Sequence, residues 1–206
     1  MVTSITLPVC IEKNFTTNLF HTLPLCVLGT VSGYHEFICE NYVNIHLLYP
    51  GYPFYINQFG KSLVYSYDLF QYEVIPTGIR VEDITVLIEE KLISAKMYAY
   101  IMMDEFYLSC KSAYNTRHIF HDSLIYGYDS TKREFLALTL GDKELIEPVR
   151  YSCADVLNAY YNFVDCYNGP SESIIFFKVN PTKLVPLFSF ENYLNHLIHY
   201  VNGICL

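Results

Sequence analysis

YAYIMMDEFYLSCKSAYNTRHIFHDSLIYGYD, residues 98–129, is the stretch that decides the fold of this 206-residue chain. It contains two strand-like runs rich in Tyr, Ile and Leu, one at 97–103 and one at 122–128. A third run, EFLALTL at 134–140, follows after the polar residues 129–132. A short polar turn between two such runs is typical of a β-hairpin. The sequence therefore predicts consecutive antiparallel strands.

Helices are predicted before and between these strands. Residues 22–48 have a partly helical pattern that Gly29 and Gly33 interrupt, and Pro24 is expected in the first turn. The segment VEDITVLIEEKLISA at 81–95 places its apolar residues on one stripe, which indicates an amphipathic helix. These patterns predict at least two helices ahead of the strand region.

The C-terminal third is expected to add two helices and a strand. Ser152 and Asp155 resemble a capping box that opens a helix through Asn162, and Ser189 is expected to cap the last helix. The remaining segments are predicted as a loop at 49–60, an extended aromatic-rich run at 62–72 and a strand at 173–179. Helices packed on a mostly antiparallel sheet make an α+β fold.

Composition predicts a single cytoplasmic domain spanning residues 1–206. The net charge of −8 has no basic stripe beside it, so nucleic acid is not expected as a partner. No run approaches eighteen apolar residues, and the first 15 residues lack a basic region followed by an apolar one. Neither a membrane span nor a signal peptide is therefore expected. The seven cysteines show no C-x-x-C spacing, which favours reduced thiols and predicts no metal site.

His121 is the candidate catalytic base. It stands at the start of an apolar strand that ends in Gly127, Tyr128 and Asp129, so the backbone holds its imidazole at a sheet edge. A general base needs that rigidity. The alternative is an ordinary surface histidine that precedes a strand.

The pattern around His121 resembles the papain-like cysteine peptidases, whose histidine opens a strand ending in Gly-Tyr-Asp. It is more similar to their homologues in natural-product gene clusters, which include the N-terminal domain of the butirosin acyltransferase. Shared features are the run Asp104-Glu-Phe-Tyr-Leu108, the nearby His118, the LPV at 7–9 and the run at 40–47. The resemblance covers residues 98–140 well and the rest of the chain weakly.

The resemblance implies a papain-like fold and a catalytic thiol beside the histidine. Relatives carry their cysteine at the start of the first long helix, which corresponds to residues 20–22, and none of these is Cys. Cys26 is the nearest candidate nucleophile, Cys10 is the alternative, and the chain can also lack one. Asp142 is the candidate third member, because it follows the strand that pairs with the histidine strand. An ordinary turn aspartate is the competing interpretation of Asp142. Asp104 and Glu105 end a neighbouring strand and are further candidates to line the cleft.

The function implied by the resemblance is amide-forming acyl transfer. An acyl or peptidyl chain would move from a carrier-protein thioester, through an acylated cysteine, to an amine or diamine. The phosphopantetheine arm of the carrier would present the substrate, and no other cofactor is expected. One alternative is a catalytically inactive partner protein of a synthetase. The other is a thioesterase or peptidase.

Overall fold

The computed structural model describes most of the chain, namely residues 4–13, 19–41, 45–46, 55–56, 63–65, 68–76, 81–141, 143–167, 172–180 and 189–202.

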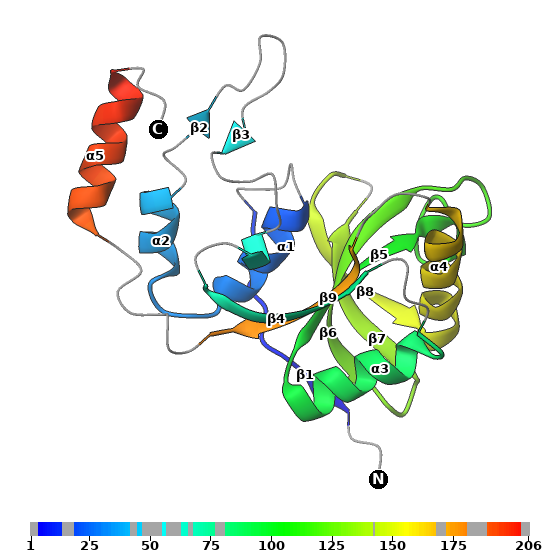
Figure 1. Ribbon diagram of the computed structural model, residues 1–206. Coiled ribbons are helices and arrows are strands. Elements are labelled where there is room, and N and C mark those ends of the chain that lie inside the picture. The colour runs from blue at the N-terminus through cyan, green and yellow to red at the C-terminus, as the bar shows by residue number, and fades with distance from the viewer. Residues whose placement is uncertain are drawn as a thin grey trace.

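The centre of the molecule is an antiparallel sheet of seven strands in the order β4-β9-β5-β6-β7-β8, with β1 paired to the far end of β6 (Figure 1). Its strands are β1 (Ile5–Thr6), β4 (Phe70–Pro76), β5 (Tyr98–Asp104), β6 (Phe120–Asp129), β7 (Glu134–Leu140), β8 (Ile146–Ser152) and β9 (Glu172–Val179). A separate two-stranded sheet pairs β2 (Ile45–His46) with β3 (Tyr55–Ile56). The predicted α+β class with a mostly antiparallel sheet is confirmed.

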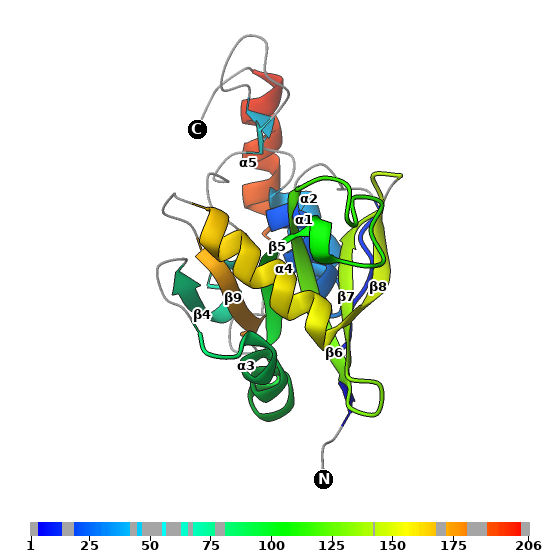
Figure 2. The same ribbon diagram turned by 90° about the vertical axis from the view of Figure 1, so that its right-hand side faces the viewer.

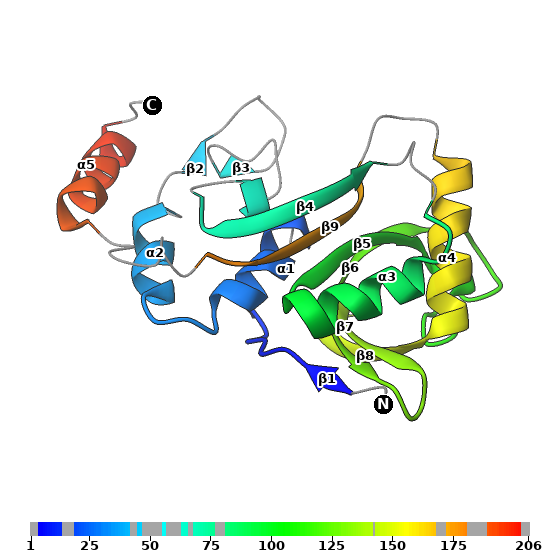
Figure 3. The same ribbon diagram turned by 60° about the horizontal axis from the view of Figure 1, so that its bottom comes forward.

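Helices cover both faces of the large sheet. Figure 2 shows α3 and α4 in front of the sheet and α1 behind it. The helices are α1 (Leu19–Leu28), α2 (Tyr34–Asn41), α3 (Ile84–Glu90), α4 (Cys153–Cys166) and α5 (Phe190–Val201). A π-helical turn at Lys91–Ala95 extends α3, and 3-10 turns lie at Leu63–Tyr65 and Glu105–Tyr107. Beyond the α1 side, α5 contacts α2, as Figure 3 shows at the end away from α4.

Helix α1 is deeply buried in the core of the protein. A continuous cluster of buried apolar residues joins α1, the sheet and α4, and Leu23, Leu25 and Val27 of α1 are fully buried. A helix that is apolar all round belongs in the interior of a protein. The structure thus places α1 as the central helix behind the sheet.

Most of the predicted elements are confirmed. The three strand-like runs are β5, β6 and β7, and β6 and β7 form the expected hairpin. The helix predicted at 81–95 is α3 with its π-helical extension, capped by the Asp83 carboxylate, which accepts from the N–H groups of Thr85 and Val86. In the same way the Ser152 Oγ accepts from the N–H of Asp155 at the start of α4.

Five element-level expectations differ from the structure. Residues 45–46 form β2 within the segment predicted as partly helical, and Leu63–Tyr65 forms a 3-10 turn within the run predicted as extended. Helix α1 begins at Leu19, so Pro24 lies inside the helix rather than in its first turn. Residues 55–56 form β3 within the segment predicted as a loop. Strand β8 is absent from the predicted elements, because its sequence IEPVRYS contains a proline and two charged residues. An edge strand tolerates both, since one side of its backbone has no partner strand.

Candidate functional site

His121 and Glu105 meet at one end of the sheet. Strands β5 and β6 are antiparallel, and Met103 lies opposite His121, so the chain leaving β5 passes beside the start of β6. The His121 Nδ1 lies 3.0 Å from the Glu105 Oε1. The His121 side chain is 38% exposed and that of Glu105 only 8%. The imidazole therefore faces solvent while the carboxylate behind it is buried.

The backbone fixes Glu105 in this position. The Asp104 carboxylate caps the 3-10 turn by accepting from the N–H of Phe106 at 3.1 Å. The N–H of Glu105 itself donates to the carbonyl of Ile119 at 2.8 Å. These two contacts hold the turn that carries Glu105 against the approach to β6.

Glu105 is held in its ionised form. Burial by itself would raise the pKa of this carboxyl, but hydrogen bonds from His121 and Lys111 and the charge of Lys111 lower its pKa overall. An ionised carboxylate only accepts hydrogen bonds, so the Nδ1–H of His121 donates to it. In this tautomer the His121 Nε2 carries a lone pair.

A buried lysine continues the polar contacts into β7. The Lys111 Nζ lies 3.0 Å from the Glu105 Oε1, and it donates to the Thr139 Oγ1 at 3.0 Å. The hydroxyls of Tyr151 and Ser123 are hydrogen-bonded at 3.1 Å on the same face of the sheet, since Ser123 lies opposite Thr139. We call His121, Glu105, Lys111 and Thr139 the His121 network.

The His121 network lies on the α4 side of the sheet. The segment that follows Glu105 is tied to α4 by two hydrogen bonds. The Tyr107 hydroxyl donates to the Asn162 Oδ1 at 2.9 Å, and the Ser109 hydroxyl donates to the Asp155 Oδ2 at 2.6 Å. Side chains alternate between the faces of a strand, so His121 shares its face with Ser123 and not with Asp122.

A second histidine–carboxylate pair lies next to the first. The His118 Nδ1 is 2.6 Å from the Oδ2 of Asp104, a fully buried carboxylate, and the His118 ring stacks on Phe106. His118 is 56% exposed and lies beside the rings of Phe106 and Tyr107, so it belongs to the rim of the site.

Cys26, the predicted nucleophile, lies away from His121. It belongs to α1, on the opposite face of the sheet from α4, and its side chain is fully buried. Its carbonyl accepts from the N–H of Cys10, and its Sγ accepts from the N–H of Glu12 at 3.4 Å. Burial raises the pKa of the Cys26 thiol to about 11, the reverse of what an activated thiolate requires. None of the described contacts joins Cys26 to His121.

Of the other two predicted positions, Cys10 lies among the described residues and Asp142 does not. Cys10 is exposed, but it lies beside Cys26 on the N-terminal segment. Asp142, the predicted third member, lies outside the residues that the structure describes. Among the described residues, Glu105 is the carboxylate that lies beside the His121 imidazole.

Asp122 is a buried carboxyl on the α1 side. Burial raises its pKa to about 6, although a hydrogen bond from Tyr100 and the charge of His121 act in the opposite direction. Its Oδ1 is buried and accepts no hydrogen bond from the described residues. Such an acceptor is costly when the carboxyl is ionised.

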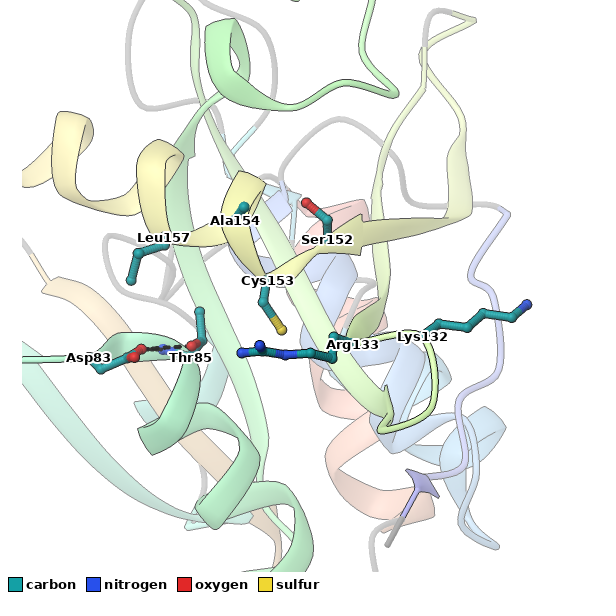
Figure 4. Close-up of a pocket in the computed structure, with 8 residues that line it drawn as sticks. All are labelled: Asp83, Thr85, Lys132, Arg133, Ser152, Cys153, Ala154 and Leu157. Atoms are coloured by element: carbon teal, nitrogen blue, oxygen red, sulfur yellow. Dashed lines mark hydrogen bonds between the residues drawn. The ribbon is translucent and has the colours of Figure 1, made fainter. Parts of the chain in front are cut away.

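A separate pocket of about 390 Å³ lies at the other end of β6 (Figure 4). It is formed by the start of α3, the start of α4 and the β6–β7 turn. In Figure 4 the Arg133 side chain extends between Cys153 and Thr85, whereas Lys132 points away. Because Arg133 lies in the turn after the last residue of β6 and His121 is near its first, a strand about 30 Å long separates the two places.

Comparison of the chain with models of known protein families and with curated proteins gives no match. The described part of the chain contains no cluster of three or more His, Cys, Asp or Glu side chains suited to hold a metal ion. Of the described helices, none combines the length and apolar character needed to cross a membrane.

Sequence reasoning locates His121 but misses two of its supporting residues. The sequence argument names Glu105 as a candidate to line the cleft but does not pair it with His121, and Lys111 does not enter the argument at all. A usable signal for Glu105 is present, because the end of one hairpin strand lies beside the start of the next. For Lys111 the contacts to Thr139 and Leu140 depend on tertiary structure alone.

Proposed function

We propose that the protein catalyses acyl transfer from a carrier-protein thioester to an amine, with His121 as the general base. The observation that carries this proposal is the half-exposed His121 imidazole oriented by a buried, ionised Glu105. A carboxylate–imidazole pair of this kind is the usual device for placing a basic nitrogen at a reacting group. The resemblance of residues 98–140 to cysteine-peptidase homologues, with its papain-like fold, supports the choice of acyl chemistry.

The Cys26 geometry favours direct attack of the amine on the thioester. The amine nitrogen forms a bond to the acyl carbon while the His121 Nε2 takes a proton from that nitrogen. The C–S bond then breaks, and the leaving thiolate receives the proton from the imidazolium. A route through an acylated Cys26 would need a thiol that is fully buried and has a pKa of about 11 to reach the substrate.

The test uses acylated carrier protein and a series of amines, with amide and free acid quantified. Replacing His121 by Ala should lower the rate of amide formation about a thousandfold, within the usual range for loss of a general base. The matched control is His35→Ala, because His35 is an exposed histidine on α2. Near-normal turnover by a folded His121→Ala protein would contradict the proposal.

Product partition separates a transferase from a hydrolase. Water is in large excess, so amide formation needs an amine held against the carbonyl, where effective molarities of ~10⁵ M are available. Amide should therefore dominate once the amine saturates the site. Free acid that dominates at every amine concentration would make the protein a thioesterase or peptidase.

A catalytically inactive partner of a synthetase is the second candidate, and the burial of Cys26 favours it. Intact-protein mass spectrometry after incubation with acylated carrier protein distinguishes the routes. A covalent adduct that maps to Cys26 supports the acyl-enzyme. Turnover without an adduct supports direct transfer, and carrier binding without turnover supports the inactive partner.

A further inference from the structure

We propose that Lys111 is the positioning residue of this site. It holds the Glu105 carboxylate against His121 from the β7 side of the sheet and keeps the His121 Nε2 available as a base. The proposal rests on the function proposed above for His121, and Lys111 itself touches no substrate. The contacts and burial of its ammonium group support this role.

The Lys111 ammonium is completely engaged within the protein. Its side chain is only 7% exposed. The Nζ contacts the Glu105 Oε1 at 3.0 Å, the Thr139 Oγ1 at 3.0 Å and the carbonyl oxygen of Leu140 at 2.6 Å. A lysine has three N–H donors, and these three acceptors use them all. Protein acceptors therefore hold the ammonium group at the end of β7, and none of its N–H donors is left to bind water.

The charge of Lys111 decides what Glu105 does to His121. A buried carboxylate is costly unless it is paired and hydrogen-bonded. With Lys111 present, Glu105 is ionised and accepts the Nδ1–H without drawing a second proton onto the ring. Without Lys111, the imidazolium form of His121 would be the one charged partner of Glu105 left among the described residues. The ring would then hold its proton more tightly, and a smaller fraction of His121 would be the free base at neutral pH.

Other titratable groups near the His121 network do not replace Lys111. Tyr151 lies behind Thr139, and its raised pKa keeps it neutral. Cys110 lies beside Lys111, and its pKa is raised by burial. On α4, Asp155 is hydrogen-bonded to Ser109. On the opposite face, Asp122 carries a negative charge only above about pH 6.

The experiment follows the His121 imidazole through a pH titration by NMR, with the signal assigned from the His121→Ala protein. Lys111→Met should raise the His121 pKa by about one unit, a tenfold increase in proton affinity. Glu105→Gln should lower it by a similar amount. Lys111→Arg keeps the charge and is the matched control. The acid limb of kcat/KM should move with the imidazole pKa in each variant.

A double variant tests whether Lys111 acts through Glu105. In the Glu105→Gln background, Lys111→Met should change the proton affinity of His121 by less than about threefold. The double variant lacks both the Glu105 and the Lys111 charge, so neither is left buried without its partner. It can therefore be measured even if Lys111→Met alone does not fold.

The outcomes separate the two proposals. An unchanged His121 pKa in folded Lys111→Met overturns the role of Lys111, as does an equal shift in both backgrounds. If the double variant has to be used alone, a His121 pKa equal to that of the natural protein overturns it as well. The expected shifts in a protein that forms no amide would refute the proposed function and leave the role of Lys111 standing.

Discussion

At the scale of single residues, neighbouring side chains on the two faces of β6 have different electrostatic surroundings. His121 faces a buried carboxylate that a lysine keeps ionised. Its neighbour Asp122 faces the α1 side, where burial raises the pKa of the carboxyl to about 6. His121 thus lies beside a carboxylate whose ionised form is stabilised, whereas burial destabilises the ionised form of Asp122.

Asp122→Asn is expected to stabilise the protein at neutral pH. The pKa of Asp122 in the folded protein, about 6, lies above the ordinary value near 3.9, so folding favours the protonated form. At low pH the Asp122 carboxyl is protonated, and its burial does not destabilise the protein. As the pH rises through 6 the carboxyl ionises, and this stability is lost. The free energy of unfolding of Asp122→Asn minus that of the natural protein should be larger at pH 7.5 than at pH 4, by on the order of 2 kcal/mol.

Urea unfolding of both proteins at pH 4, 6 and 7.5 measures this difference. Asp155→Asn provides a control, because Asp155 is a carboxyl with an exposed hydrogen bond to Ser109. A free energy difference between the natural protein and the Asp122→Asn variant that does not change with pH would contradict the raised pKa.

At the scale of elements, the close approach of β1 to β6 explains why the Gly-Tyr-Asp sequence has a glycine at position 127. It lies opposite Thr6 of β1 and beside a register shift between β6 and β7. A Cβ at this position would come within 2.8 Å of the Leu136 Cδ1 and 2.9 Å of the Ile5 carbonyl oxygen. The glycine therefore lets β1 approach β6 closely.

Gly127→Ala should destabilise the protein by about 2 kcal/mol, because an overpacked site forces neighbouring backbone to move. The free energy of unfolding in urea measures the loss. Ser130→Ala is the control: it removes the exposed side-chain contact of Ser130 with Ser4 and should change stability by less than about 0.5 kcal/mol. A folded Gly127→Ala protein of unchanged stability would show that β1 is not held against β6.

At the scale of the whole molecule, the net charge of −8 should attract cationic acceptors. Charges beyond a Debye length of about 10 Å act on the substrate only at low ionic strength. For a diamine acceptor, KM should rise severalfold between about 20 and about 200 mM salt, while kcat stays constant. A monoamine should show a smaller rise because it carries half the charge. Equal salt effects on both amines would exclude attraction by the overall charge.

The sequence by itself determined the local elements and the candidate base. Runs rich in Tyr, Ile and Leu predicted β5, β6 and β7, a polar turn predicted the hairpin of β6 and β7, and Ser152 predicted the start of α4. These signals are local, because the residues that make each element are close together in the chain. His121 was found for the same reason, as the residue that opens a recognisable strand.

Only the tertiary structure decided which groups surround His121 and which do not. Glu105 lies 16 positions before His121 and contacts it directly. Lys111 is held by a contact with Leu140, 29 positions away, which no local pattern encodes. Cys26 was chosen from its place in the chain, yet the sheet lies between its helix and α4. The raised pKa values of Cys26 and Asp122 depend on burial. Burial is set by what packs around a side chain, so it appears only when distant segments of the chain come together.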